Sequence, residues 1–226
     1  MMLSDVMEDY LKVIYQLQRE SDARIRTSEI AAELDVTSPT VTSMLEKLEE
    51  RGLVDREKYQ GVKLTDEGRT VALEVVRHHR LLEAYLTEHL DYDWAEVHEE
   101  ADRLEHHISE DFEARVADAL GDPTVDPHGS PIPSADLEPL ETTDAESITG
   151  FEEGDVVVVE EVADHDPEVL SYLADHGVEP GIELEILEIA PFGMITAQAV
   201  GRSEPVSLPE DVARDVRVDA SKRAEH

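Results

Sequence analysis

The spacing of apolar residues changes along the chain, and this change limits the folds that it can adopt. In the first segment Val6, Tyr10, Val13, Ile14 and Leu17 recur at three- to four-residue spacing, which is typical of an amphipathic helix. Similar spacing continues to about residue 120, whereas from about residue 155 apolar and polar residues alternate as they do in half-buried strands. We therefore expect an α+β protein with helical segments first and a β-rich segment last.

The first 68 residues predict a winged helix-turn-helix. Helices are expected over residues 6–17, 27–34 and 37–51, and two short strands over residues 53–54 and 62–64 around a polar hairpin. Helix, helix, tight turn, helix and β-hairpin is the order of elements in that fold.

Polar residues mark where the second and third helices begin. Thr27 or Ser28 is expected to cap the second helix, and Thr37 or Ser38 the third. Pro39 falls in the first turn of the third helix, where its missing N–H costs no hydrogen bond. These signals set the start of the helix that would read DNA.

The rest of the chain predicts a helical part and a small β-barrel. Two further helices are expected over residues 65–87 and 94–120, followed by a Pro- and Gly-rich loop over residues 122–139. Strands are expected over residues 155–162, 182–189, 194–200 and 205–208, with a short helix over residues 168–176.

These segments predict three domains. The predicted order is a winged helix-turn-helix over residues 1–68, a helical domain over 69–140, a linker over 141–150, an SH3-like β-barrel over 151–219 and a tail over 220–226.

Composition excludes several classes of function. The chain has no cysteine, which excludes disulfides, thiolate metal sites and cysteine nucleophiles. No run approaches the roughly 18 apolar residues of a membrane span, and the first residues lack the basic region of an export signal. We therefore expect a cytoplasmic protein that does not bind membranes.

The chain is strongly acidic, with a formal net charge of −36. The carboxylates are spread along every segment, which favours adaptation to concentrated salt, as in a halophile. An ordinary acidic protein is the alternative.

The first 68 residues carry a net charge of only −6 and the remainder −30. A nearly neutral N-terminal third is expected of a surface that contacts DNA phosphates, although chance variation is the alternative.

The third helix carries the candidate DNA contacts. Hydroxyl groups at its start can reach phosphates or base edges, and basic residues on and near it can contact the backbone. The candidates are Thr37, Ser38, Pro39, Thr40, Thr42, Ser43, Lys47, Arg51, Lys58 and Lys63. Winged helices also bind proteins, so this signal by itself leaves that alternative open.

Histidines and carboxylates gather in the predicted helical domain. Six of the ten histidines fall between His78 and His107. His79 and Glu83 are one helical turn apart, and His78, His89 and His107 are expected at the surface. The next predicted helix presents four further candidates within an arc of roughly 100°, namely His98, Asp102, Glu105 and His106. Imidazoles and carboxylates without thiolate suit Mn²⁺ or Fe²⁺; the alternative is a solvated polar surface.

Together these features resemble the diphtheria toxin repressor family of iron- and manganese-dependent transcription regulators. The stretches that carry the resemblance are MEDYLKVIY (7–15), SPTV (38–41), HRLLE (79–83), VHEEADRLEH (97–106) and PHGSPIP (127–133), in this order. The resemblance covers essentially the whole chain, and the last domain is similar to the FeoA-type barrel of the longer family members.

The resemblance implies two metal sites per subunit. One site would use His79, Glu83 and His98, completed by a side chain of the barrel for which Asp166 and Glu168 are the nearest matches. The other would use Asp9, Asp102, Glu105 and His106.

Two departures from the family bear on the choice of metal. Iron-responsive relatives have methionine and cysteine where this chain has Asp9 and Asp102, and the two carboxylates make the site harder, favouring Mn²⁺. Manganese-responsive relatives carry glutamate in place of Lys12 and lack the histidine that matches His98. Both metals stay open, with manganese ahead.

The expected function is therefore a non-enzymatic, metal-dependent repressor of metal-uptake genes. It would act as a homodimer on a palindromic operator in double-stranded DNA, without a small organic ligand. A metal bound by Asp9 and by residues of the helical domain would tie these two domains together and fix the recognition helices.

Two other functions compete with this interpretation. A winged-helix regulator that senses a small molecule would leave the His-rich helices purely structural. Paired His and carboxylate sites also occur in two-metal hydrolases, but the chain has no HExxH sequence, nucleophile elbow or phosphate loop.

Overall fold

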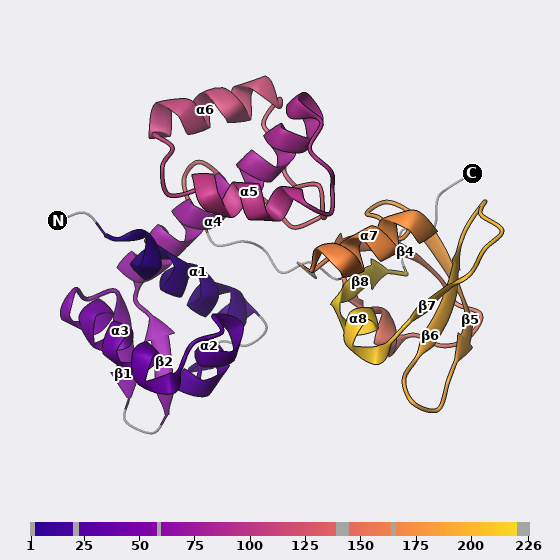
Figure 1. The fold of residues 1–226 in the computed structure, drawn as a ribbon, viewed down its shortest axis with the longest axis horizontal. Helices are drawn as coiled ribbons and strands as arrows, with labels where there is room; N and C mark the ends of the chain where they lie inside the picture. Colours follow the sequence, from indigo (N-terminus) through magenta and orange to yellow (C-terminus); the bar gives the residue numbers. More distant parts are fainter. Residues whose placement is uncertain (1–2, 20–22, 58–59, 139–144, 164–165, 221–226) are drawn as a thin grey trace. The chain divides into compact units, whose positions relative to one another are not determined.

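The structure is a computed structural model that describes residues 3–19, 23–57, 60–138, 145–163 and 166–220 (Figure 1). The chain divides into two compact units. The first comprises residues 1–79, 104–113 and 133–142, and the second residues 80–103, 114–132 and 143–226. This division falls inside one continuous helix, after His79, so the domain boundaries predicted from the sequence stay predictions.

The first unit contains the predicted winged helix-turn-helix. Its elements are α1 (Asp5–Arg19), α2 (Thr27–Glu33), α3 (Ser38–Glu50), β1 (Val54–Glu57) and β2 (Gly61–Leu64). The two strands pair antiparallel, from Val54 opposite Leu64 to Glu57 opposite Gly61. The apolar positions that gave the helical spacing form one core, in which Leu11, Ile14 and Leu48 are fully buried.

The helix caps agree with the sequence at α3 and differ at α2. Thr37 is the N-cap of α3, and its hydroxyl accepts a hydrogen bond from the backbone N–H of Thr40 at 3.4 Å. The N-cap of α2 is Arg26, not Thr27 or Ser28. Glu29, the third residue of the helix, accepts the backbone N–H of Arg26 at 2.7 Å, which is the bond that the glutamate of a capping box makes to the N-cap residue.

The helical part consists of α4 (Asp66–Leu90), α5 (Val97–Leu104) and α6 (Glu110–Ala119). The single helix predicted over residues 94–120 is wrong, because the chain leaves the helix after Leu104 in a turn. There the N–H of His107 bonds to the carbonyl of Leu104 at 2.9 Å. Ser109 then accepts the backbone N–H of Phe112 at 3.3 Å and caps a new helix.

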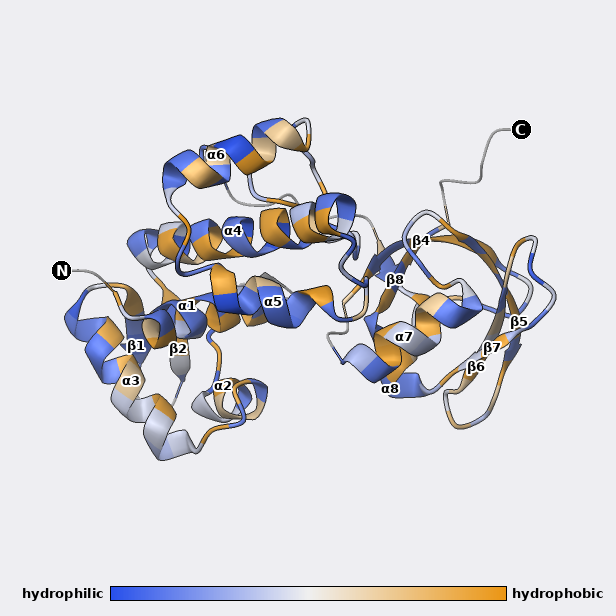
Figure 2. Cartoon of the chain, turned by 45° about the horizontal axis from the view of Figure 1, so that its top comes forward, coloured by the Kyte–Doolittle hydropathy of each residue, from blue (hydrophilic) through white to orange (hydrophobic). Residues whose placement is uncertain are grey.

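The second unit contains a six-stranded antiparallel sheet with the order β3-β8-β4-β5-β6-β7. Its strands are β3 (Glu146–Ser147), β4 (Val156–Val162), β5 (Glu183–Ile189), β6 (Ile195–Ala199), β7 (Val206–Leu208) and β8 (Val216–Asp219). All four predicted strands occur, with ends shifted by one residue. The sheet curls around its own core (Figure 2), in which Val159, Leu184 and Ile186 are fully buried.

Two strands and a helix of this sheet region have no counterpart in the sequence prediction. Strand β3 lies in the predicted linker and pairs with β8, Glu146 opposite Val218. Helix α8 (Glu210–Asp215) leads directly into β8. The predicted short helix is α7 (Pro167–His176), capped by Asp166.

Polar and apolar residues alternate around α4 and α1 in the way that amphipathic helices require (Figure 2). None of the helices in the described ranges combines the length and the apolar character needed to cross a bilayer.

Candidate metal centre

A first cluster of ligand-type side chains joins α1 to the turn that follows α5. Asp9, Glu105 and His106, here called the Asp9 group, each offer a ligand atom within 4.8 Å of the others. The Nε2 of His106 lies 2.8 Å from Oδ1 of Asp9 and 3.4 Å from Oε1 of Glu105. All three residues belong to the first unit, although Asp9 and His106 are 97 positions apart in the sequence. Three of the four residues predicted for this site therefore come together.

The imidazole of His106 lies among carboxylates. Its Nδ1 is 2.8 Å from Oε2 of Glu8, and its Nε2 is 2.8 Å from Asp9. The hydrogen bond to Asp9, followed by that to Glu8 and the charge of Glu105, raises the pKa of His106 to about 9 against the opposing effect of burial. Without a metal, a protonated His106 therefore neutralises part of the negative charge of the Asp9 group.

Helix α5 ends before two of the predicted ligands. Glu105 and His106 lie in the turn after Leu104, so the prediction that they share one helical face with His98 and Asp102 is wrong. The turn carries Glu105 inward, where it is 1% exposed. Asp102 stays on α5, where Oδ2 lies 3.5 Å from Nε2 of His98.

A lysine of α1 lies against the same glutamate. The ammonium of Lys12 donates to both carboxylate oxygens of Glu105, at 2.8 and 3.1 Å. It also lies 3.1 Å from Nδ1 of His79, which is itself 2.5 Å from Oε2 of Glu105. Lys12 is 8% exposed and Glu105 1%, so this is a buried cation in contact with a predicted metal ligand.

His78 departs from its predicted position at the surface. It is 7% exposed, with Nδ1 3.0 Å from the carbonyl oxygen of Glu105 and Nε2 3.3 Å from a carboxylate oxygen of Glu113. The surface prediction was wrong for His78, because it faces the turn that carries Glu105. His89 and His107 are exposed, as expected.

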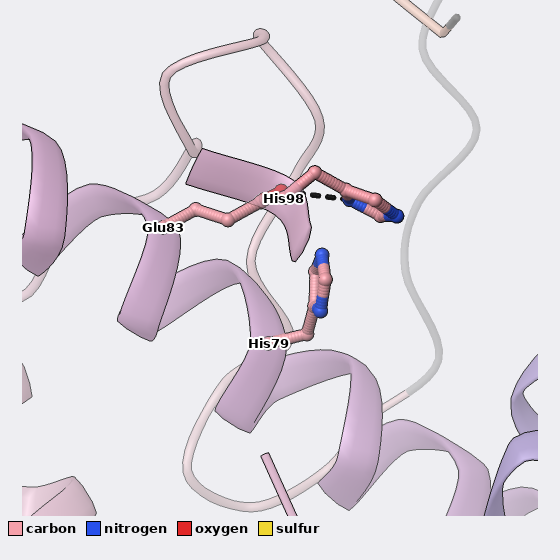
Figure 3. Close-up of side chains that lie close together, drawn as sticks. All are labelled: His79, Glu83 and His98. Carbon is pink, nitrogen blue, oxygen red and sulfur yellow. Dashed lines mark hydrogen bonds and ion pairs between the residues drawn. The ribbon is translucent and has the colours of Figure 1, made fainter. Parts of the chain in front are cut away.

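A second cluster lies along α4 and α5 and is called the Glu83 group, namely His79, Glu83 and His98. Within the second unit, Nδ1 of His98 lies 3.1 Å from Oε1 of Glu83. His79 precedes Glu83 by one turn of the same helix, so helical geometry places both on one face of α4. Figure 3 shows the three side chains, with the Glu83–His98 interaction drawn as a dashed line.

A third cluster, which the helical spacing of the sequence did not indicate, consists of Glu83, Asp126 and His128 and is called the Asp126 group. All three are buried, and Nδ1 of His128 lies 3.8 Å from Oε1 of Glu83. Asp126 and His128 flank Pro127 in the loop after α6, and this Asp-Pro-His sequence was the available signal. Because the loop lacks helical spacing, only the fold shows that it returns to α4.

The environment of Asp126 disfavours its charge. Burial and the nearby carboxylate of Glu83 raise the pKa of Asp126 to about 7, although Arg80 lowers it. Oδ1 of Asp126 accepts the backbone N–H groups of His128 and Ser130, at 2.8 and 3.0 Å. Asp126 therefore holds the loop in shape while it shares a buried space with Glu83.

The two candidates from the barrel are not part of these clusters. Asp166 is the N-cap of α7, where its Oδ1 accepts the backbone N–H of Glu168 at 2.9 Å. Both side chains are exposed. In the part of the chain that the structure describes, no set of converging ligand atoms includes either residue, so their role as ligands stays a prediction.

The Asp9 group fits a divalent metal. Its donors are carboxylate oxygens and imidazole nitrogen, the set that suits Mn²⁺ and Fe²⁺. Ligand atoms around a six-coordinate ion with bonds of about 2.0–2.5 Å lie at most about 4–5 Å apart, which matches the 4.8 Å within which these atoms lie. The largely buried Glu105 supplies the charge that such an ion requires.

The predicted DNA contacts lie on α3 and around it. Thr37, Ser38, Pro39, Thr40 and Ser43 are exposed at the start of the helix, while Thr42 is half-buried. Lys47 and Arg51 are exposed at its far end, and Lys63 is half-buried on β2. Lys58 lies outside the described residues. The exposed hydroxyls form the polar N-terminal surface that a recognition helix presents.

Comparison with protein families matches each part of the chain in turn. A model described as the iron dependent repressor N-terminal DNA binding domain covers residues 2–62. A second, the iron dependent repressor metal binding and dimerisation domain, covers residues 65–134. A FeoA domain model covers residues 147–220.

Full-length relatives agree with these matches. The iron-dependent repressor IdeR of Mycobacterium tuberculosis is 35% identical over 228 residues, covering 96% of this chain and 98% of that protein. The diphtheria toxin repressor of Corynebacterium diphtheriae is 32% identical, covering 96% and 98%. A solved manganese-dependent transcriptional repressor in complex with manganese is 38% identical, with a TM-score of 0.87 over 95% of this chain and 99% of that one.

Proposed function

The chain belongs to the family of iron-dependent repressors, and on this premise we propose that it is a metal-dependent, DNA-binding transcriptional repressor. One observation carries the proposal. Asp9 lies on α1 of the winged helix-turn-helix, and the structure brings its carboxylate together with Glu105 and His106 from beyond α5. A single set of ligands thus joins the element that supports the recognition helix to the helical part of the chain.

The proposed cofactor is Mn²⁺ or Fe²⁺, with manganese ahead. Relatives are named for either metal, but the donors here are carboxylates and imidazoles, which favour the harder ion. Up to two ions per subunit are proposed, one held by the Asp9 group and one by the Glu83 group. Bound there, a divalent ion supplies positive charge that offsets the repulsion among the carboxylates.

The chain's own residues would turn ligand binding into a change of shape. Asp9 lies on α1 and moves with it, whereas Glu105 and His106 lie in the turn after α5 and move with that turn. Holding their side chains together selects one arrangement of these elements from those that the chain samples. A shift from 1:99 to 99:1 between two arrangements requires about 5.5 kcal/mol of differential binding.

The proposed target is a palindromic operator bound by a homodimer. In a two-fold dimer, two copies of α3 would reach successive major grooves only when their separation is correct. We propose that the genes repressed when metal is plentiful encode metal uptake.

The acidic composition implies an unusual response to salt. With a net charge of −36, the chain is repelled by DNA at low ionic strength, and at about 1 M salt counterion release offers little driving force. Base contacts and DNA shape would therefore carry most of the affinity, and the loss of binding with rising KCl would be shallow.

A binding selection tests the proposed function. Duplexes would be selected from a random pool with the metal-free chain, once with Mn²⁺ and once with a chelator, at fixed ionic strength. We expect enrichment of a palindromic sequence with Mn²⁺ alone, and release of the selected duplex when a chelator is added. Equal binding of that duplex with and without metal would show that the proposed function is wrong.

A further inference from the structure

We propose that the ammonium of Lys12 acts as a built-in cation beside the Asp9 group, so that this group binds one metal ion and not a pair. The inference rests on the proposed function and adds a residue that sets how many ions bind there and how tightly. It concerns only residues of the first unit.

The position of the ammonium is the first argument. Its nitrogen lies 2.8 and 3.1 Å from the two oxygens of Glu105 and 3.1 Å from Nδ1 of His79. A carboxylate and an imidazole facing one point are the donors that a divalent metal would use. In this chain the ammonium of Lys12 occupies the position that such a metal would take.

The sharing of Glu105 is the second argument. The same Oε1 that accepts from Lys12 at 3.1 Å lies 3.4 Å from Nε2 of His106. Glu105 therefore faces His106 and Asp9 on one side and Lys12 and His79 on the other. An ion held by the Asp9 group and a second ion beside His79 would share this carboxylate, and the ammonium occupies the second position.

Burial is the third argument. Lys12 and Glu105 are 8% and 1% exposed, and a buried carboxylate is costly unless a cation compensates it. Lys12 provides that cation when no metal is bound and holds the Glu105 side chain in place as a ligand. The same positive charge also repels an ion in the Asp9 group, so the affinity for metal is lower than the ligands alone would give.

Two substitutions of Lys12 separate these effects. Lys12→Gln removes the charge and keeps a polar side chain, so we expect the same number of bound Mn²⁺ ions and an affinity about tenfold tighter, since a nearby positive charge is lost. Lys12→Glu supplies a third donor beside His79 and Glu105, so we expect one additional Mn²⁺ per chain.

The measurement is the number and affinity of Mn²⁺ ions bound by the full-length chain, from the electron paramagnetic resonance signal of free Mn²⁺. The spectrum of the fully loaded Lys12→Glu chain should also show the magnetic coupling of a manganese pair. Arg214→Glu is the matched control, because it makes the same change in charge on the exposed surface of α8 and should alter neither value.

Two results would overturn the inference. One is a folded Lys12→Glu chain that binds the same number of ions as the unsubstituted chain. The other is unchanged affinity in Lys12→Gln, and this result decides by itself if Lys12→Glu does not fold. The proposed function fails separately, if the unsubstituted chain binds Mn²⁺ but selects no duplex.

Discussion

The Asp9 group and the Asp126 group are both built from a buried glutamate, an aspartate and a histidine, yet they are assembled in different ways. In the Asp9 group the side chains come from α1 and from the turn after α5, and the ammonium of Lys12 lies against Glu105. In the Asp126 group two residues come from one loop, whose backbone shapes it. The first cluster thus depends on long-range packing and charge, and the second on local backbone geometry.

The backbone of the second cluster is fixed further by the sheet. The carbonyl of His128 accepts the N–H of Val162 on β4 at 2.9 Å, and Ser130 donates to the buried Glu161 at 2.5 Å. The arrangement of the Asp126 group should therefore depend mainly on the backbone conformation of its loop. The arrangement of the Asp9 group should depend mainly on the charges of its side chains. Four predictions test this difference.

The largest expected effect is on stability, from Gly129→Ala in the loop of the Asp126 group. Gly129 has φ +88°, and a Cβ would lie 1.9 Å from the carbonyl oxygen of Glu160. We expect the free energy of unfolding to fall by about 3 kcal/mol, from backbone strain together with overpacking. Urea denaturation measures this loss.

Gly121→Ala is the matched control for that loss. Gly121 also has a positive φ, +74°, but a Cβ there meets nothing within 4 Å. Strain alone should cost about 1–2 kcal/mol. Equal losses at the two glycines would show that contact with β4 contributes nothing to the loop.

The next effect concerns the coupling of metal to DNA. Asp9→Ala removes the ligand that α1 contributes, so we expect Mn²⁺ to lose its enhancement of duplex affinity, about a hundredfold for a typical coupling of this kind. Fluorescence anisotropy with and without Mn²⁺ measures the enhancement. Asp5 is exposed at the start of the same helix, so Asp5→Ala is the control and should keep the enhancement by Mn²⁺. If Asp9→Ala also kept the enhancement, α1 would have no part in the mechanism.

A smaller effect follows from the protonation of His106. Because its folded pKa of about 9 lies above the ordinary histidine value of 6.5, its contribution to the stability of the metal-free chain is full below about pH 6.5 and is lost as the pH rises through 9. Metal binding must displace that proton, so Mn²⁺ affinity at the Asp9 group should rise by about tenfold per pH unit until pH 9.

Titrations with Mn²⁺ at several pH values check this slope. They are best made in His98→Ala, which weakens the Glu83 group and isolates the Asp9 group. Affinity that stays level between pH 7 and pH 9 would contradict the proposed role of the His106 proton.

The smallest effect is the pH dependence contributed by Asp126. Its folded pKa of about 7 lies above the ordinary aspartate value of 3.8, so the folded chain binds the proton more tightly than the unfolded chain. The free energy of unfolding therefore falls as the pH rises from about 4 to 7. Asp126→Asn keeps the acceptor oxygen and removes the charge. This substitution should reduce the change in the free energy of unfolding with pH by at most about 1.4 kcal/mol per pH unit.

Thermal unfolding across this pH window measures the slope. Asp118 is exposed on α6, so Asp118→Asn is the control and should leave the pH dependence of stability unchanged. A slope in Asp126→Asn equal to that of the unsubstituted chain would mean that Asp126 is charged throughout the window.

Local patterns in the sequence were enough for most of the fold. Helical spacing gave α1 to α4, and alternation gave β4 to β7, because these patterns report which face of a single element is buried. The break between α5 and α6 was missed, since apolar spacing continues across it and only Ser109 marks the new start. Strands β3 and β8 are short, and only their pairing in the sheet, β3 with β8 and β8 with β4, identifies them as strands.

The sequence by itself determined the winged helix-turn-helix, the donor types without thiolate, and the identity of His79, Glu83 and His98 as candidate ligands. Asp9 was added by the resemblance to a known family. Tertiary structure alone decided that Lys12 lies on Glu105, that Asp126 and His128 return to Glu83, and that Glu105 points inward from a turn. The physical reason is distance along the chain. Helical periodicity constrains neighbours three or four residues apart, whereas a buried charge is paired with a partner that only packing brings into contact.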